Sequence, residues 1–479
     1  MESPWARSLC SLPVLQHYRP VMKGTPLSAL TFILVCAILS LIMENTSLHS
    51  DLPLIQDADL NGKTVLVRFD HNVVKGGEVR DPYRIDRTLG TLFHIVERGG
   101  RPIMMTHVGR PKDKKTGKIL CRPDESIEAI VQYLEQKLHT KFHIPRFPID
   151  PEKGITGIDT SINLAIRELR ERRIGGIYLP NTRWFQGEEA EGEAREHLSV
   201  QLAGLADIYI NDAFGSWQPH ASTYDITQYL PSYAGFLMQQ EIMHLSSVLN
   251  PPRPFVAVVA GAKYDTKIGP LYAIYEKVDR LILGGVIYNT FLCAKYHVRI
   301  KGVTDEDIAL AKELVDKDSV YRKIVELPYI VESDTLEGRI EGKYRTISIK
   351  DLKSGNSYGY ILDIDPRSFE DTTVAEAIGT ARTTFVNAVM GYTPYFIEGS
   401  QALDTTIDHN RNAMKMYGGG DTLQEFKNLC PGLYLSVMDN AQYYFFTGGG
   451  TVLTAIEQGS PYGLKPVQAL MQSKKNLVK

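Results

Sequence analysis

The stretch Val256-Ala257-Val258-Val259-Ala260-Gly261-Ala262-Lys263 decides the fold, because a short apolar run breaks into glycine and then lysine. Three further apolar runs in the same half of the chain end in glycine, at Leu281–Gly285, Met416–Gly420 and Tyr443–Gly450. Glycine lets backbone N–H groups approach an anion closely, and the start of a following helix favours negative charge. Four such turns predict one parallel sheet whose strand ends line a phosphate-binding crevice.

The apolar runs of the N-terminal half end in polar and basic side chains instead. Thr64–Phe69, which contains Arg68, is followed by Asp70 and Asn72, and Pro102–Thr106 is followed by His107 to Arg110. In the same way, Gly176–Leu179 is followed by Asn181 and Arg183, and Ile208–Ile210 by Asn211 and Asp212. The planar guanidinium of arginine matches the oxygens of carboxylates and phosphates. These ends predict a site for a small anion, and the alternative is a set of surface ion pairs at loop tips.

Segments with helical apolar spacing lie between these runs, at Asp86–Arg98, Ser126–His139, Ile162–Arg172 and Glu193–Leu205. The alternation predicts an α/β fold with two doubly wound parallel-sheet lobes that face a central cleft. A hairpin or a short antiparallel sheet is expected over Asp334–Lys350. The expected units are an N-terminal extension at 1–50, an N-terminal substrate-binding lobe at 51–245, a C-terminal nucleotide-binding lobe at 246–450, and a segment at 451–479 that returns to the N-terminal lobe.

Composition excludes several classes of protein. The net charge of -3, with no long basic block, argues against nucleic-acid binding. The 5 cysteines have neither metal-ligand spacing nor the pattern of a disulfide framework. Residues 27–43 are almost entirely apolar and follow Arg19 and Lys23, which predicts a signal anchor and membrane association. A cleaved signal, a bipartite organelle presequence and a mispredicted first exon remain alternatives, so the compartment, cytoplasmic or organellar, stays open.

A basic lobe that faces a glycine-rich lobe suits phosphoryl transfer from a nucleotide to a small anion, because this chemistry needs positioning and charge neutralisation. None of the glycine turns is a Walker A sequence. Lys263 and Lys267 are four residues apart and so share one face at a helix start. Asp421 is a candidate ligand for Mg²⁺ held through the nucleotide, or a helix N-cap, or both.

In this order the segments resemble the phosphoglycerate kinase family, over roughly Asp57 to Leu470. The segments that carry the resemblance are Val67 to Val73, Asp81 to Ile85, His107 to Pro111, Asn181 to Trp184, Asn211 to Gly215, Ala260 to Lys263 with Lys267, Gly418 to Thr422, and Thr447 to Gly450. Asn211 to Gly215 is identical to the family's Asn-Asp-Ala-Phe-Gly. The resemblance implies reversible phosphoryl transfer between 1,3-bisphosphoglycerate and ADP, with hinge closure of two lobes, Mg²⁺, and a monomeric enzyme.

The resemblance also implies the role of each site residue. Arg84 and Lys263 would be catalytic. The residues that would hold 3-phosphoglycerate are Asp70, Asn72, Arg84, His107, Arg110 and Arg183. Those that would bind ATP or ADP are Lys263, Lys267, Gly284, Gly285, Gly418, Gly419, Gly420, Asp421 and Thr422, with Asp421 for the metal.

The chain departs from the family at both substrates. Ser216 to Ser222 replaces a stretch whose arginine contacts the substrate phosphate, and Tyr264 and Thr266 stand where the family has Val and Asp. The glutamate that contacts the nucleotide ribose aligns near Pro394, and Val386 to Val389 replaces Trp-Asn-Gly-Pro. Two alternatives follow: a catalytically weakened binding or scaffold protein, and a kinase for another small carboxylate.

Overall fold

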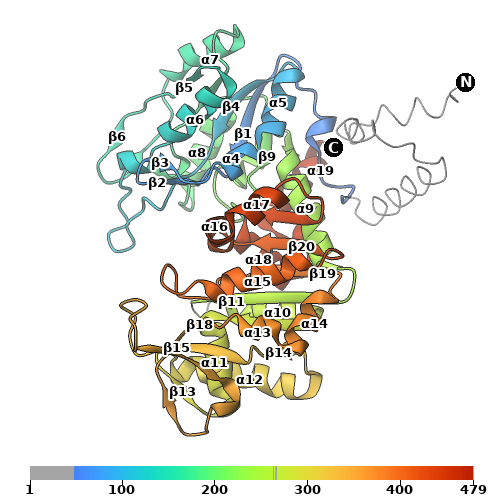
Figure 1. The fold of residues 1–479 in the computed structure, drawn as a ribbon. Helices are drawn as coiled ribbons and strands as arrows, with labels where there is room; N and C mark the ends of the chain where they lie inside the picture. Colours follow the sequence, from blue (N-terminus) through green and yellow to red (C-terminus); the bar gives the residue numbers. More distant parts are fainter. Residues whose placement is uncertain (1–47, 263, 265–266, 478–479) are drawn as a thin grey trace, which may run out of the picture. The chain divides into compact units, whose positions relative to one another are not determined.

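The computed structural model describes residues 48–262, 264 and 267–477. The first half of this region is built on a six-stranded parallel sheet in the order β10-β9-β1-β4-β8-β5 (Figure 1). Its strands are β1 Thr64–Phe69, β4 Arg101–Met105, β5 Phe142–His143, β8 Gly176–Tyr178, β9 Ile208–Asp212 and β10 Ser232–Ala234. All residues of β1 are buried, as expected for a central parallel strand covered on both faces.

Helices cover this first sheet, and each buries one apolar stripe. They include α5 Leu89–Glu97, α6 Glu128–Leu138, α7 Ile162–Arg170 and α8 Glu193–Ala203. Helix α7 buries Ile162, Ala165, Ile166 and Leu169, the spacing of an amphipathic helix. The four predicted helices are confirmed with slightly shorter limits.

The second half is built on another six-stranded parallel sheet, in the order β14-β12-β11-β19-β20-β21. Its strands are β11 Phe255–Gly261, β12 Arg280–Gly284, β14 Ile324–Val325, β19 Thr383–Asn387, β20 Met414–Gly418 and β21 Tyr443–Phe446. The order runs outward from β11 in one direction and then resumes at β19 on its other side. Such a reversal leaves a crevice at the carboxyl ends of the two strands, which is where open α/β sheets bind ligands.

The predicted fold class, two doubly wound parallel sheets, is confirmed. The helices of the second half are α10 Ile268–Lys277, α11 Gly285–Tyr296, α12 Asp305–Tyr321, α13 Arg367–Glu370, α14 Thr372–Gly379, α15 Glu398–His409, α16 Gly420–Leu429, α17 Pro431–Val437 and α18 Gly449–Gln458. The predicted hairpin begins earlier, with β15 Tyr329–Ser333 paired antiparallel to β16 Tyr344–Ser348, and β18 Tyr360–Ile364 joins it as a third strand.

Helix α9, Phe236–Leu249, connects the two halves. Its buried residues Ile242, Leu245 and Val248 belong to the same apolar cluster as Phe255 and Val258 of β11. The apolar core is therefore continuous from the first sheet to the second through this helix.

The C-terminal helix α19, Lys465–Leu477, packs against β10 of the first sheet. Figure 1 shows α19 beside the first half of the chain. Two hydrogen bonds join this end of the chain to the first described residues: the Tyr462 hydroxyl accepts one from His49 N at 2.9 Å, and Lys474 Nζ donates one to Ser50 O at 2.6 Å. A segment from the far end of the sequence therefore packs onto the sheet that is made first.

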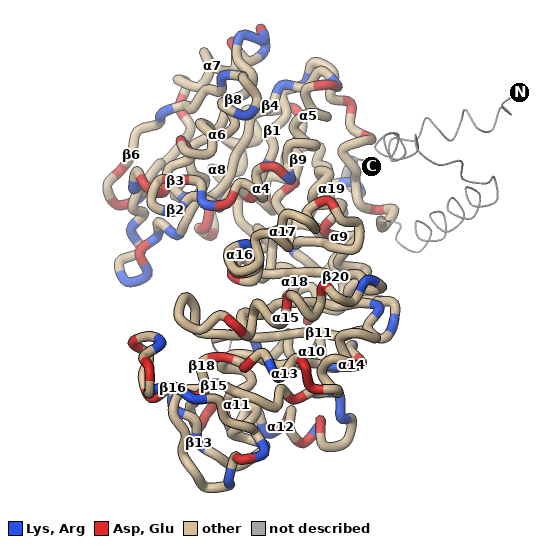
Figure 2. Tube along the Cα trace, in the orientation of Figure 1, with Lys and Arg blue, Asp and Glu red and all other residues tan. Residues whose placement is uncertain are grey.

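Basic and acidic residues are interspersed over both halves, in keeping with the net charge of -3 (Figure 2). No helix within the described residues is long and apolar enough to cross a membrane. The apolar segment 27–43 lies outside those residues, so its targeting or anchoring role stays a prediction.

Candidate active site

The carboxyl ends of β1, β4 and β9 meet at one edge of the first sheet. The register sets Arg68 of β1 beside Met105 of β4 and Asn211 of β9, so the residues that follow these strands are neighbours. Six residues were predicted to hold the small anion. This edge brings together Asp70, Asn72, Arg84, His107 and Arg183, and Arg110 is exposed beside them.

Arg68 is the buried arginine that bonds to other residues of this edge. Its side chain is only 1% exposed, and its Nη2 lies 3.1 Å from His107 Nδ1. Its Nε donates to Ser222 Oγ at 2.9 Å, and that hydroxyl donates to Glu188 Oε1 at 2.6 Å. The guanidinium and the carboxylate are thus joined through one hydroxyl, which fixes the positive charge in place before any ligand binds.

Asp70 and Arg84 form an ion pair at the front of the edge. Asp70 is 4% exposed, and Arg84 Nη1, from the short helix α4 (Tyr83–Asp86), lies 3.3 Å from its Oδ2. A Cβ on Gly215 would collide with the same oxygen, so this position in Asn211–Gly215 requires glycine. Arg84 Nη2 also lies 3.9 Å from where a Cβ on Gly420 would stand. Its guanidinium therefore lies between Asp70 and the glycine loop of the second sheet.

The histidines of this edge are neutral at pH 7. Burial and the charge of Arg68 lower the pKa of His71 to about 3, and its ring contacts the hydroxyls of Tyr178 at 2.9 Å and Thr88 at 2.8 Å. Burial, followed by Arg68 and Arg183, holds the pKa of His107 well below its usual value. The positive charge offered to an anion here comes from arginine, since the histidines supply only hydrogen bonds.

The guanidinium of Arg183 already contacts other groups of the protein. Its Nη1 donates to Gly109 O at 2.6 Å, and its Nε lies 2.7 Å from Glu189 Oε1. Asn72 Oδ1 accepts from Gly109 N at 3.0 Å, so Asn72 and Arg183 both fix the turn that follows β4. Phosphate binding at Arg183 would have to compete with the carboxylate of Glu189.

The loop 216–222 has no arginine, and histidine and serine side chains stand there instead. Ser216 Oγ lies 3.5 Å from His107 Nδ1, and His220 Nε2 lies 3.9 Å from Glu189 Oε1. Burial lowers the pKa of His220, although Glu188 and Glu189 act in the opposite direction. The loop thus supplies hydrogen-bonding groups without a fixed positive charge.

The second sheet carries a cavity of about 560 Å³ at its switch point. Glycines and polar groups of three strand-to-helix turns line it: Ala260, Gly261 and Ala262; Gly285 and Val286; and Gly419, Gly420, Asp421 and Thr422. Gly284 and Gly418 are the last residues of β12 and β20 and precede the lining residues. The cavity is large enough for a small-molecule ligand, and the start of α16 lines it, where free backbone N–H groups favour an anion.

Lys267 is the basic side chain in the lining of this cavity. Its Nζ donates to Ala260 O at 2.6 Å and to Asn387 Oδ1 at 2.8 Å. Burial lowers the pKa of Lys267 to about 8, while the charge of Asp421 acts in the opposite direction. Lys263, the other predicted cation, lies outside the described residues.

Asn387 is a site residue whose role the sequence did not predict. It ends β19, accepts from Lys267 and donates through Nδ2 to Gly418 O, so it joins the two turns that flank the cavity. The sequence signal for this strand end was weak, because β19 ends in Asn-Ala and lacks the glycine that marked the other strand ends at the cavity. Glu188 and Ser222 were missed for another reason: their link to Arg68 is visible only in three dimensions.

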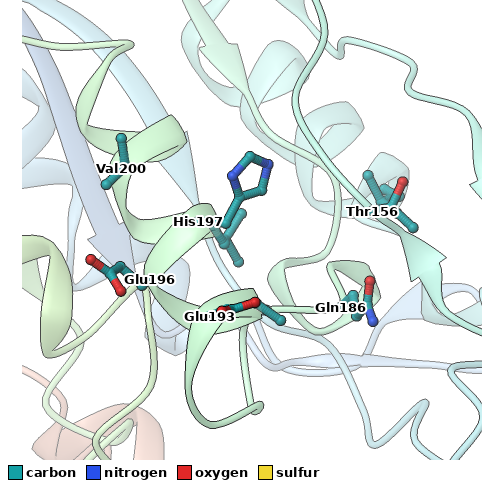
Figure 3. Close-up of a pocket in the computed structure, with 10 residues that line it drawn as sticks. Thr156, Gln186, Glu193, Glu196, His197 and Val200 are labelled. Atoms are coloured by element: carbon teal, nitrogen blue, oxygen red, sulfur yellow. The ribbon is translucent and has the colours of Figure 1, made fainter.

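A separate hollow of about 580 Å³ lies beside α8 in the first half (Figure 3). Thr156, Gln186, Glu193 and His197 are among its lining residues. None of the predicted site residues lines it, so it is not part of the candidate active site.

A family model described as phosphoglycerate kinase matches residues 55–459, most of the chain. The chain belongs to the phosphoglycerate kinase family. The phosphoglycerate kinases of Rubrobacter xylanophilus and of a strain of Thermus thermophilus are each 33% identical to it. The alignments cover 84% of this chain and 95% of the Rubrobacter protein, and 86% of this chain and 98% of the Thermus protein.

Solved phosphoglycerate kinase structures have the same fold. The structure from Coxiella burnetii gives a TM-score of 0.67 at 27% sequence identity and covers 88% of this chain and 99% of its own. The structure from Pyrococcus horikoshii gives a TM-score of 0.64 at 21% identity, covering 89% and 100%, which shows a common fold. The resemblance carried by the motifs is thereby confirmed.

Proposed function

We propose that this chain is a phosphotransferase that moves a phosphoryl group between 1,3-bisphosphoglycerate and ADP, giving 3-phosphoglycerate and ATP. The observation that supports it most is the position of Arg84, 3.3 Å from Asp70 and 3.9 Å from the Cβ position of Gly420. A cation between an acceptor site and a phosphate loop is what transfer of an anionic group requires.

The acceptor would bind at the edge of the first sheet. Asp70 Oδ1 is buried and has no hydrogen-bond partner among the described residues, so a hydroxyl of the acceptor that reached it would satisfy an unpaired oxygen. Arg84, Arg110 and Arg183 would neutralise its carboxylate and phosphate, and His107 and Asn72 would orient it. The fixed network behind Arg68 would keep these groups in position during the reaction.

The nucleotide would bind in the cavity of the second sheet, with its phosphates at the start of α16 and at Lys267. Asp421 is exposed in the first turn of α16 and lines the cavity. One carboxylate together with substrate phosphates is a usual donor set for Mg²⁺, so the residues present fit this metal. When bound, Mg²⁺ would neutralise charge on the nucleotide phosphates.

Transfer would then depend on positioning and charge. Arg84 would stabilise the charge of the moving group, and Lys263 is the cation proposed on its other side. Closure of the proposed lobes, 51–245 and 246–450, would exclude water from the reacting groups. Water would otherwise hydrolyse the nucleotide.

A coupled assay of the full-length chain with 3-phosphoglycerate and Mg-ATP tests this function. We expect turnover in the wild type and at least about a 100-fold loss in Lys267→Met, because a buried cation at the phosphates is removed. The exposed Lys312→Met is the matched control and should keep its activity. A folded protein that binds Mg-ADP without turnover would overturn the proposed reaction.

A kinase for another small carboxylate is the second candidate. It is favoured by the loop 216–222, which lacks an arginine, and by the pairing of Arg183 with Glu189 at 2.7 Å. Turnover of a related carboxylate with little turnover of 3-phosphoglycerate would select it. Binding of nucleotide without any turnover would instead select the scaffold alternative.

Membrane association through residues 27–43 and a monomeric state stay predictions. Fractionation of cells that express the full chain tests the first, and the mass of the purified protein in solution tests the second.

A further inference from the structure

One helix forms a polar wall of the nucleotide cavity. Asp421, Gln424, Glu425 and Asn428 of α16 all line it, with the spacing of a single helix face. Because a helix rises 1.5 Å per residue, this wall extends about 10 Å from the proposed phosphate site. A nucleotide anchored at the start of α16 would therefore lay its sugar alongside the middle of the helix.

The other residues that line the same cavity include the apolar Val286, Ile361, Leu362, Val389 and Met390. The lining also contains polar side chains, but Lys267 and Asn387 are bonded to each other and Thr393 donates to Glu425. Apolar side chains suit the flat face of a base, whereas sugar hydroxyls need hydrogen-bond partners. The hydroxyls are therefore expected toward the polar wall of α16.

Glu425 is the buried carboxylate in that wall. It is 6% exposed, yet it lines the cavity. Its Oε1 accepts from the Thr393 hydroxyl, and its Oε2 accepts from Ser400 Oγ at 3.0 Å. A carboxylate offers about four acceptor positions, so two remain for a ligand. Burial, the largest effect, raises the pKa of Glu425 although both hydroxyls lower it.

The neighbouring loop contacts Glu425 through Thr393. The family resemblance aligns a ribose-contacting glutamate near Pro394, and proline has no side-chain acceptor. Thr393, the residue before it, donates to Glu425. A carboxylate from α16 thus reaches the loop at the point where the aligned carboxylate is missing.

We propose that Glu425 selects the sugar of the bound nucleotide, its carboxylate accepting hydrogen bonds from the vicinal ribose hydroxyls. This inference rests on the proposed function, since it assumes that the cavity binds a nucleotide. It assigns to a residue of α16 the discrimination between a ribonucleotide and a nucleotide that lacks both hydroxyls.

Calorimetric titration of the full-length chain with Mg-ADP and with Mg-2′,3′-dideoxy-ADP tests the proposal. We expect the wild type to bind ADP about 10- to 100-fold more tightly, because hydrogen bonds to a charged group are strong. Glu425→Met, which has a similar volume and no acceptor, should bind the two nucleotides within about threefold of each other. Glu425→Gln, which keeps one acceptor oxygen, should give an intermediate ratio.

The exposed Glu376→Gln of α14 is the matched control and should keep the wild-type ratio. Glu425→Met that weakens both nucleotides equally, with the ratio unchanged, would show that Glu425 only supports the loop and would overturn the proposal. ADP binding by the wild type without discrimination would also overturn it. Binding of neither nucleotide would instead overturn the proposed function, and the sugar selection with it.

Discussion

The two strand-end sites of this molecule handle negative charge in different ways. At the first sheet, buried side chains bond to one another: Arg68 and Asp70 are 1% and 4% exposed, and their charges face His107, Ser222 and Arg84. At the second sheet, glycine turns and the start of α16 surround a cavity of about 560 Å³. The first site is thus held by side-chain contacts, and the second by backbone.

This difference indicates which substitutions should damage each site. A network of bonded side chains is rigid, so loss of one member leaves a buried partner unsatisfied. A backbone site tolerates many side-chain changes but depends on the cation beside it, Lys267. Four predictions test this contrast, beginning with the largest expected effect.

Arg84 lies next to both sites, paired with Asp70 and 3.9 Å from the Cβ position of Gly420, so its loss should be the most damaging. We expect Arg84→Met to lower kcat by about 100- to 1000-fold, the effect of removing one donor to a charged transition state. The KM for ATP should change less than about threefold. The exposed Arg80→Met is the control, since Arg80 contacts only Glu78 at 3.7 Å among the ion pairs of the described chain. A loss of less than tenfold in the coupled assay would contradict the role of Arg84.

Ser222 tests the rigidity of the first site. Ser222→Ala should lower the free energy of unfolding by about 2–3 kcal/mol, because Arg68 Nε and Glu188 Oε1 both lose a buried partner. Urea titration measures it. Ser319→Ala, at an exposed hydroxyl of α12, should cost less than about 0.5 kcal/mol. Equal losses in the two variants would mean that the network adds nothing to stability.

Lys267 gives the second site a pH dependence. Its pKa of about 8 means that the ammonium is present below pH 8 and is lost above it. Phosphates stay anionic, so ADP affinity should fall about tenfold between pH 7.5 and 9.5. Lys267→Arg should remove this dependence, since arginine stays charged. Calorimetry across this range checks it, and a flat wild-type profile would contradict it.

The ion pair between Lys427 and Asp81 should have the smallest effect. Lys427 Nζ of α16 lies 2.6 Å from Asp81 Oδ2, just before the helix that carries Arg84. The side chains are 14% and 29% exposed, so the pair is partly screened. Lys427→Met should lower kcat/KM by about three- to fivefold, whereas the exposed Lys312→Met should not. The same kcat/KM for both variants would show that this ion pair does not couple α16 to α4.

Much of the fold could be predicted from the sequence, because buried parallel strands leave continuous apolar runs. Thr64–Phe69 has the predicted limits, and three of the four glycine-ended runs lie on the crevice as expected. Strand β19 was not predicted as a strand, since its end at Asn387 lacks the glycine signal. Tertiary pairing explains that gap: Asn387 works by joining Lys267 to Gly418, which are distant in sequence.

Several site residues could be predicted from the sequence alone, because Asp70 and His107 follow apolar runs that parallel strands bring to one edge, and glycines end the runs at the cavity. Arg84 follows no such run and was predicted only from the family resemblance. The partner that restrains each of them was not predictable, because the Arg68, Ser222 and Glu188 contacts depend on loop conformation. For the same reason, the sequence did not foresee that burial lowers the pKa of His71 and of His107.

The packing of α19 against β10 has a consequence for synthesis. Strand β10 is the edge of the first sheet, yet the helix that covers it is translated only after the whole second sheet. The first half of the chain therefore leaves the ribosome without α19, whose buried Val467 and Leu470 belong to the apolar cluster that extends through this half, and the apolar surface under them stays uncovered until α19 has been made. A chain stopped before residue 465 would keep this surface exposed, which makes truncated products targets for chaperones or for aggregation.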